Sequence, residues 1–179
     1  MSALLPAFLA ASGVLALAGA IKLRTPEPTV GALAAAGIRV SAGAVRALGA
    51  CEVGLAVACA LRPSTATALA LAVVYLAFAA FVAAALRRGD AAPCGCFGDA
   101  GVQLTGWHLA LDLAAAAIAI ATALAPPSWS AVPAGSLAPA ALAIGVAAAV
   151  YLAHAAYTTL PAMAGARDGG RTRGSRWDR

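Results

Sequence analysis

Long apolar runs separated by short polar stretches dominate the chain. The runs cover Leu4–Ile21, a stretch that ends at Leu61, Thr65–Leu86, Trp107–Leu124 and Leu137–Leu160. Each is roughly eighteen residues or longer, which is enough for a helix to cross the hydrocarbon core of a bilayer. The alternation of apolar and polar residues that is typical of strands is absent from these runs. The pattern predicts an all-α fold, a polytopic membrane helical bundle with four core transmembrane helices and a fifth.

The segment between the first two runs has a different pattern. Thr25-Pro26-Glu27-Pro28 contains two prolines, which lack a backbone donor and restrict the residue before them, so we expect the first helix to end before it. Thr29 is then expected to cap a short interfacial helix over Val30–Ile38. The start of the second span stays open, because Arg46 can extend back along its own helix toward the membrane surface.

Composition supports the bilayer as the solvent of this chain. Hydrophobic residues make up 63% of the sequence and charged residues 11%, whereas about one quarter of a soluble domain is charged. A net charge of +5 would suggest nucleic acid as the partner of a soluble protein. Here the basic residues lie between and after the apolar runs, where they set topology and contact anionic lipid. We therefore expect the lipid bilayer as a partner and no nucleic acid.

The placement of lysine and arginine predicts an orientation. If the amino terminus faces outward, all of these residues except Arg62 fall on one side of the membrane. The positive-inside rule makes that side cytoplasmic. We expect a multi-pass protein of the cell membrane with its amino terminus outside. The loop between the third and fourth spans and the carboxyl-terminal tail are then cytoplasmic.

That loop carries the most specific pattern of the sequence, Pro93-Cys94-Gly95-Cys96-Phe97-Gly98-Asp99. A thiol attacks as its thiolate, so its reactivity requires a lowered pKa and access. The nearby start of the fourth helix, and the charge of Lys22 or Arg87, are candidate causes of a lowered pKa. A disulfide between Cys94 and Cys96 closes a small ring, and strained bridges exchange easily. The loop predicts a thiol–disulfide exchange site, and two unreactive loop cysteines are the alternative.

Successive spans alternate in direction, so the first and third loops share one side of the membrane. The polar side chains that we expect to meet at this end of the bundle are Lys22, Cys51, Glu52, Cys94, Cys96, His108 and Asp112. Cys51 is a candidate third thiol for relay. His108 and Asp112 are spaced i, i+4 and share one helix face, as a pair that steadies the helix start or supports the site. His154 is expected to be a bundle histidine rather than a ligand.

Glu52 has two interpretations. An ionisable side chain within a span costs on the order of 3 kcal/mol, so it normally faces a partner or a cavity. In the first interpretation Glu52 forms a buried ion pair with Lys22 or Arg46 that fixes helix packing. In the second it is a proton acceptor near the thiols. A metal site made by Cys94, Cys96, His108 and Asp112 is a further alternative, but no Cys-x-x-Cys pair is present, and we predict no metal.

These features together resemble the MauE (methylamine utilisation protein MauE) branch of the DoxX-like integral membrane proteins. The resemblance rests on the first span ending in Lys22, the Pro-containing segment, Gly37-Ile38, the second span with Glu52 and the Cys94-Gly95-Cys96-Phe97-Gly98 string. It covers residues 1–125, a four-span membrane domain with the Cys-x-Cys loop at residues 93–99. Residues 126–164 add a C-terminal span, and residues 165–179 form a basic tail that we expect to be disordered.

The resemblance implies an accessory role in the methylamine metabolic process. MauE-like proteins are associated with maturation of the disulfide-rich small subunit of methylamine dehydrogenase, alongside a thioredoxin-like partner. That dehydrogenase matures outside the cytoplasm, whereas the charge pattern places these thiols inside. Either the orientation is reversed, or electrons cross the membrane, or this chain has another client.

The leading hypothesis is an integral membrane protein that assists thiol–disulfide exchange or disulfide maturation of a client. Its catalytic residues would be Cys94, Cys96 and Glu52, and its partner a thioredoxin-like protein or a disulfide-containing client. One alternative is a non-enzymatic membrane scaffold that docks a soluble oxidoreductase, and another is a metal-handling or transport subunit. No cofactor is firmly implied. A quinone is a candidate, but no residue pattern identifies a site for one.

Overall fold

The computed structural model describes residues 4–88, 104–127, 129 and 137–174, with side chains described as far as Thr159. Six helices form these parts of the chain, and none of the described residues lies in a strand. They are α1 (Leu4–Arg24), α2 (Glu27–Ala35), α3 (Ala42–Leu61), α4 (Thr65–Arg88), α5 (Gly106–Leu124) and α6 (Ala138–Gly174). Five helices are long and apolar enough to cross a membrane, namely α1, α3, α4, α5 and the part of α6 over Ala138–Thr159. The predicted all-α bundle of four core spans and a fifth is confirmed.

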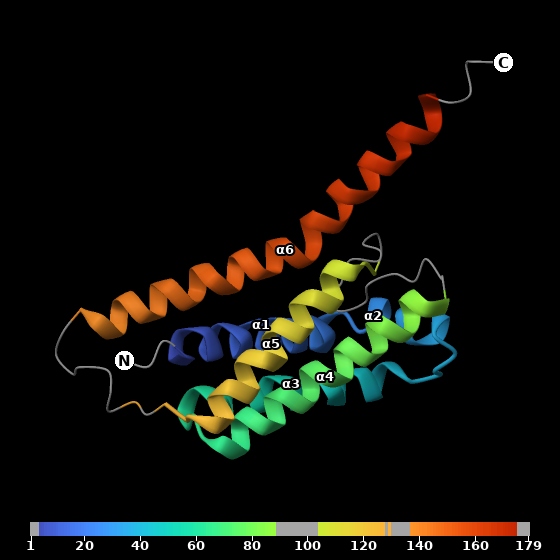
Figure 1. The fold of residues 1–179 in the computed structure, drawn as a ribbon. Coiled ribbons are helices and arrows are strands. Elements are labelled where there is room, and N and C mark those ends of the chain that lie inside the picture. Colours follow the sequence, from blue (N-terminus) through green and yellow to red (C-terminus); the bar gives the residue numbers. More distant parts are fainter. Residues whose placement is uncertain (1–3, 89–103, 128, 130–136, 175–179) are drawn as a thin grey trace.

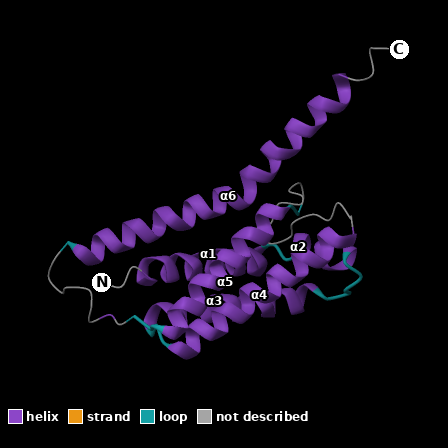
Figure 2. Cartoon of the chain, viewed as in Figure 1, coloured by secondary structure: helices purple, strands orange, loops and turns teal. Residues whose placement is uncertain are grey.

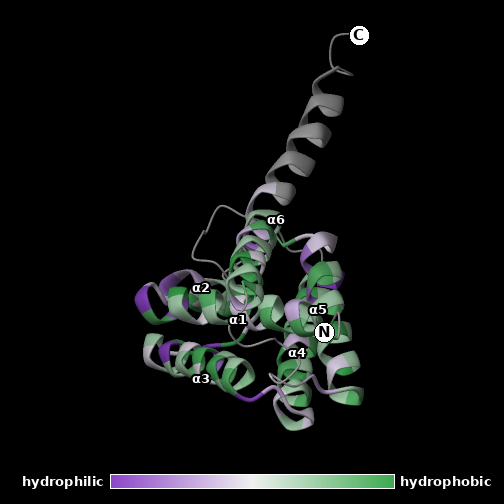
Figure 3. Cartoon of the chain, turned by 90° about the vertical axis from the view of Figure 1, so that its left-hand side faces the viewer, coloured by the Kyte–Doolittle hydropathy of each residue, from purple (hydrophilic) through white to green (hydrophobic). Residues whose placement is uncertain are grey.

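The helices pack around α1. Helix α1 lies against α3 and also contacts α5 and α6, while α4 packs mainly on α5. Figure 1 shows α6 lying across the outside of this bundle and extending beyond it. Seen from the end in Figure 3, α1 lies between the α2–α3 side and the α4–α5 side, and the bodies of the helices are largely hydrophobic in colour.

The core combines a few large side chains with many alanines. Phe8, Leu15 and Leu71 are fully buried there, together with small residues such as Ala68 and Ala119. Small residues let membrane helices approach closely, so that dispersion contacts hold the bundle together. The surfaces facing outward carry large apolar side chains, including Val73 and Leu76 on α4 and Ile144 and Leu152 on α6. A bilayer accommodates these exposed residues, and water would not.

The prediction for the short interfacial helix, Val30–Ile38, was wrong at both ends, because α2 covers Glu27–Ala35. Helix α2 begins at Glu27, its N-cap is Pro26, and Pro28 and Thr29 lie within its first turn. Proline is tolerated there because the first backbone N–H groups of a helix have no partner inside the helix. At the other end, Gly37 has a φ of +82° and the backbone N–H groups of Gly37 and Ile38 bond to Ala34 O and Leu33 O. This left-handed glycine closure ends the helix before Ile38.

The structure settles the start of the second span, which the sequence left open. Ser41 is the N-cap of α3, and its Oγ accepts a hydrogen bond from the backbone N–H of Ala44 at 3.2 Å. An N-cap serine satisfies one of the free donors at a helix start. Arg46 therefore lies in the second turn of α3, where it is exposed.

Helix α6 continues to Gly174, across the first ten residues of the segment that the composition predicts to be a disordered tail. Figure 2 shows this continuation as one helix that leaves the bundle. Adding a residue to an existing helix costs far less than starting one. The helix bends part-way along (Figure 1), and its sequence contains Pro161. Because a proline has no backbone N–H and its ring crowds the preceding turn, a proline within a helix is a common cause of such a bend.

Candidate functional site

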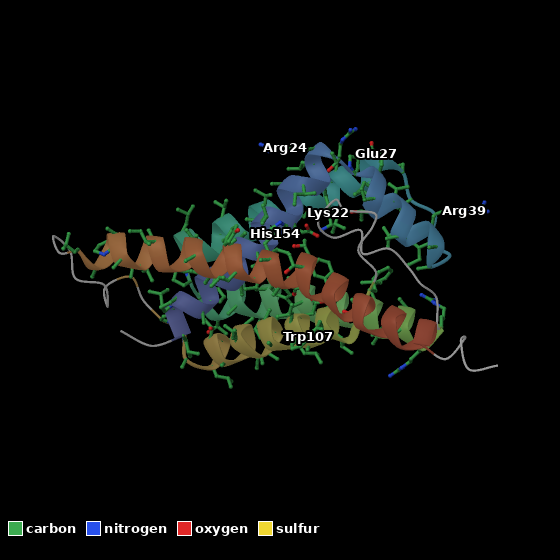
Figure 4. All side chains as sticks on the ribbon, turned by 90° about the horizontal axis from the view of Figure 1, so that it is seen from above. Lys22, Arg24, Glu27, Arg39, Trp107 and His154 are labelled. Carbon is green, nitrogen blue, oxygen red and sulfur yellow. The ribbon has the colours of Figure 1, made fainter. Side chains whose placement is uncertain are left out.

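Two close helices bring a lysine and a glutamate together inside the bundle. Lys22 Nζ on α1 lies 2.8 Å from Glu52 Oε2 on α3, and the two side chains are 3% and 1% exposed. Figure 4 shows Lys22 inside the bundle, whereas Arg24 and Arg39 point away from it. Of the two partners predicted for Glu52, the structure shows Lys22, while Arg46 is exposed.

Two glycines make this ion pair geometrically accessible. A Cβ added to Gly19 would lie 2.6 Å from Gly49 O, and a Cβ added to Gly49 would lie 2.7 Å from Gly19 O. The helices therefore cross with backbone against backbone. Lys22 and Glu52 each follow one of these glycines by three positions, so each lies on the same helix face as the contact. The close crossing points both charged side chains into one shared space.

The charges of the pair are only partly compensated. Lys22 Nζ also lies 5.4 Å from the centroid of the Phe78 ring, within the range of a cation–π contact. Glu52 Oε2 accepts from Lys22, but among the described residues Glu52 Oε1 has no hydrogen-bond partner. A buried carboxylate oxygen normally has a partner. This oxygen is therefore open to a proton or to a donor that the described residues do not supply.

The start of α5 contributes the second group of polar side chains. Thr105 is the N-cap, and its backbone N–H donates to Nδ1 of His108 at 3.1 Å. His108 is almost wholly buried. A ring nitrogen that accepts from a backbone N–H carries no proton of its own, so His108 closes the helix start with Nδ1 deprotonated. The sequence did not predict this capping role.

Asp112 is tied to the last helix. Its Oδ1 accepts a hydrogen bond from the hydroxyl of Tyr157 on α6 at 2.8 Å. The rings of His108 and Tyr157 are also in contact, with centroids 5.8 Å apart. Tyr157 was not among the residues predicted from the sequence. The available signal was a residue able to donate a hydrogen bond in the fifth span, three positions after His154.

The two polar groups face a common cavity. Its volume is about 20 Å³, and its lining includes Lys22, Tyr75, Leu104, His108, Asp112 and Tyr157. A space of this size holds one water molecule or one oxygen-sized group. The predicted meeting of Lys22, Glu52, His108 and Asp112 at one end of the bundle is therefore seen, and their chemical roles stay predictions.

The four cysteines differ in exposure and in whether the structure describes them. Cys51 is free and exposed on α3, so the structure does not bring it into this cluster. Cys59 is free and buried, and its Sγ lies 3.6 Å from Thr67 O. Cys94 and Cys96 lie outside the described residues. The described residue that follows their loop is Leu104, which lines the cavity.

Within the described part of the chain, no group of three His, Cys, Asp or Glu side chains is arranged to hold a metal ion. The predicted four-donor alternative includes Cys94 and Cys96, which are outside these residues, so it stays a prediction.

Comparison with known proteins places the chain in a family. The family model for the methylamine utilisation protein MauE matches residues 1–126. The match spans α1 to α5 and ends before α6 begins. No curated protein and no solved structure matches the chain. Because the matched region is well over half of the 179 residues, the resemblance seen in the sequence is confirmed at the family level: this multi-pass helical membrane protein belongs to the MauE family.

Proposed function

We propose that this MauE family protein is a membrane thiol–disulfide exchange factor that assists disulfide maturation of a client. Cys94 and Cys96 are its redox pair. The observation that carries the proposal is the position of Leu104, which follows the Cys-x-Cys loop in the chain and lines the same cavity as Lys22 and His108. In the sequence, the only stretch with two closely spaced cysteines therefore lies a few residues before a described residue of the cavity that Lys22 and His108 also line.

The chemistry is an exchange of one disulfide for another. The thiolate of one loop cysteine attacks a client disulfide, forms a mixed disulfide and expels a client thiolate, which takes up a proton. The second loop cysteine then attacks the mixed disulfide and releases the reduced client. Cys94 and Cys96 end as a disulfide, and the client has gained two electrons and two protons. The same steps run in reverse oxidise the client.

The basic residues nearest to the two loop cysteines in this proposal differ in how much positive charge they can offer. Lys22 is paired with Glu52 at 2.8 Å, so much of its positive charge is compensated within the bundle. Arg87 and Arg88 end α4 immediately before the loop and are exposed. Positive charge near a cysteine favours its thiolate. In this proposal Arg87 and Arg88 stabilise the thiolate, and Glu52 Oε1 serves as a proton acceptor beside the cavity.

The redox state of the loop tests the proposal. The full chain is purified in lipid nanodiscs and equilibrated in glutathione buffers of defined potential. It is then alkylated and digested, and the mass of the loop peptide is measured by mass spectrometry. We expect a Cys94–Cys96 bridge that appears and disappears reversibly with potential. One of the two single variants should trap a mixed disulfide with the client: Cys94→Ser if Cys96 is the attacking cysteine, or Cys96→Ser if Cys94 is. Cys51→Ser and Cys59→Ser are matched controls and should leave the loop peptide unchanged.

Two results would contradict the exchange function. A loop that forms neither a bridge nor a mixed disulfide at any potential excludes it. Client maturation that survives replacement of both Cys94 and Cys96 by serine would instead indicate a scaffold that docks a separate oxidoreductase.

The proposed topology places the amino terminus outside and the Cys94–Cys96 loop in the cytoplasm, where a thioredoxin-like partner would meet it. The support is the concentration of lysine and arginine on the side of this loop. A membrane-impermeant maleimide added to intact cells should leave both loop cysteines unlabelled, and should label them after the membrane is opened. Labelling in intact cells would show the opposite orientation and would leave the proposed exchange chemistry unchanged.

A further inference from the structure

A second space adjoins the polar cavity on the side facing the membrane. It is an apolar groove of about 290 Å³ between α1, α5 and α6, and residues that line it include Ala10, Val14, Tyr75, Ala115, Ala153 and Tyr157. Small-molecule sites begin at roughly this size and are mostly apolar with a few polar groups. Ala114 on its rim is exposed. Because α1, α5 and α6 are membrane-spanning helices, the groove opens toward lipid.

The groove and the cavity share a wall. Val14, Tyr75 and Tyr157 line both spaces. Beyond this wall lies Lys22, whose ammonium group has three N–H donors, of which Glu52 Oε2 takes one. The cavity, at about 20 Å³, has room for one oxygen atom beside Lys22 but not for a ring. A molecule that occupies both spaces needs an apolar body in the groove and a projecting acceptor oxygen in the cavity.

We propose that the groove binds a membrane quinone, with the ring between α1, α5 and α6 and one carbonyl oxygen directed past Tyr157 toward Lys22. The proposal rests on the proposed function in the direction that oxidises the client, because that direction leaves Cys94 and Cys96 as a dithiol, which needs an acceptor of two electrons to become a disulfide again. The dithiol of Cys94 and Cys96 loses two electrons and two protons and becomes a disulfide, while the quinone gains both and becomes a quinol. A buried lysine stabilises the negative charge that develops on the carbonyl oxygen during reduction.

A second groove of the bundle provides the contrast. It lies between α1, α3 and α6, has a volume of about 430 Å³, and is lined by residues that include Leu9, Val57, Ala143 and Val146. Its wall includes Ser12, whose hydroxyl already donates to Phe8 O at 2.8 Å, and Trp129, whose Nε1 donates to Ala60 O at 3.0 Å. Among the described residues, neither groove has a charged group in its own lining, but this larger groove shares no lining residue with the cavity beside Lys22. We expect it to hold acyl chains without preference for a quinone.

Photolabelling with a short-tailed azido-ubiquinone tests the site in the full chain reconstituted in quinone-free nanodiscs. We expect labelled peptides from the groove faces of α1, α5 or α6. Decylubiquinone should compete for this labelling, and decanol, which has the alkyl chain without the ring, should not. Ala153→Phe fills the groove and should lower labelling about tenfold or more. Ala143→Phe, on the same helix but in the second groove, is the matched control and should leave labelling within about twofold.

Several outcomes overturn the quinone site. If decanol competes as well as decylubiquinone does, the groove accepts any alkyl chain. If Ala143→Phe lowers labelling as much as Ala153→Phe does, labelling is not specific to this groove. If Ala153→Phe does not fold, Ala114→Trp on the exposed rim makes the same test. Labelling should survive replacement of both loop cysteines by serine. Specific labelling without loop redox activity would refute the proposed function alone, and loop redox activity without specific labelling would refute the quinone site alone.

Discussion

Lys22 and Glu52 form a 2.8 Å ion pair at the point where the backbones of α1 and α3 touch. Each partner is buried, and each lies one helical turn from the glycine that allows the contact. The helix crossing and the ion pair are therefore one structural unit. Changing either glycine moves the charges, and removing either charge leaves the other without compensation.

Removing one charge of this pair should destabilise the bundle. We expect Glu52→Gln or Lys22→Met to lower the free energy of unfolding by about 3 kcal/mol, because each leaves a buried charge uncompensated. The double variant Lys22→Met/Glu52→Leu should recover much of the loss. Unfolding in mixed micelles, followed by circular dichroism, measures these differences. Arg46→Met removes an exposed charge from α3 and should change stability by less than about 0.5 kcal/mol.

The glycine contact predicts opposite results for two glycines of the same helix. Gly49→Ala places a Cβ 2.7 Å from the Gly19 carbonyl oxygen, and a backbone atom cannot move aside as a side chain can. We expect a loss of about 1–3 kcal/mol in the same unfolding measurement. Gly54→Ala meets nothing within 4 Å and should be neutral or stabilising by up to about 1 kcal/mol. Equal effects at both positions would show that α1 and α3 are not in close contact.

Tyr157→Phe isolates the hydrogen bond between α6 and Asp112. The variant keeps the ring against His108 but removes the hydroxyl that lies 2.8 Å from Asp112 Oδ1. We expect a loss of about 1–2 kcal/mol and faster amide hydrogen exchange in α6. Tyr151→Phe is the matched control, because Tyr151 is on the same helix and is 70% exposed. A Tyr157→Phe variant with unchanged exchange in α6 would contradict the predicted role of the bond.

Two leucines of α4 distinguish the core from the lipid-facing surface. Leu71 is fully buried and Leu69 is 50% exposed. Leu71→Ala should leave a cavity and lower the free energy of unfolding by about 2 kcal/mol or more. Leu69→Ala exchanges contacts mostly with lipid, so the same measurement should change by less than about 1 kcal/mol. A larger loss at Leu69 would require a different rotation of α4 about its axis.

The sequence predicted the spans and the meeting of polar residues because both follow from the bilayer. Apolar length alone locates a spanning helix, which is why Leu61 as the end of α3 and Thr65 as the start of α4 were found. A charge inside a span needs a partner, which is why Lys22 was proposed for Glu52. Only the structure shows that this partner, and not Arg46, is used.

Other features depend on geometry that a pattern of residues does not carry. The start of α2 was misplaced because Pro26 and Pro28 stop a helix in its interior but begin one in its first turn. The sequence placed His108 and Asp112 on one helix face, but it did not show that His108 Nδ1 accepts from Thr105 or that Asp112 accepts from Tyr157. Tyr157 was missed because it reaches this cluster from a helix that begins after the family match ends. The roles of Cys94 and Cys96 stay predictions.

Tyr157 joins the helix beyond the family match to a residue within it. The MauE family match supplies Asp112, and the helix beyond the match supplies the hydroxyl that bonds to it. A chain shortened to residues 1–126 would lose that donor and also one wall of the groove beside it. Helix α6 thus combines two positions in one element, because the same tyrosine that bonds to Asp112 also lines the lipid-facing groove.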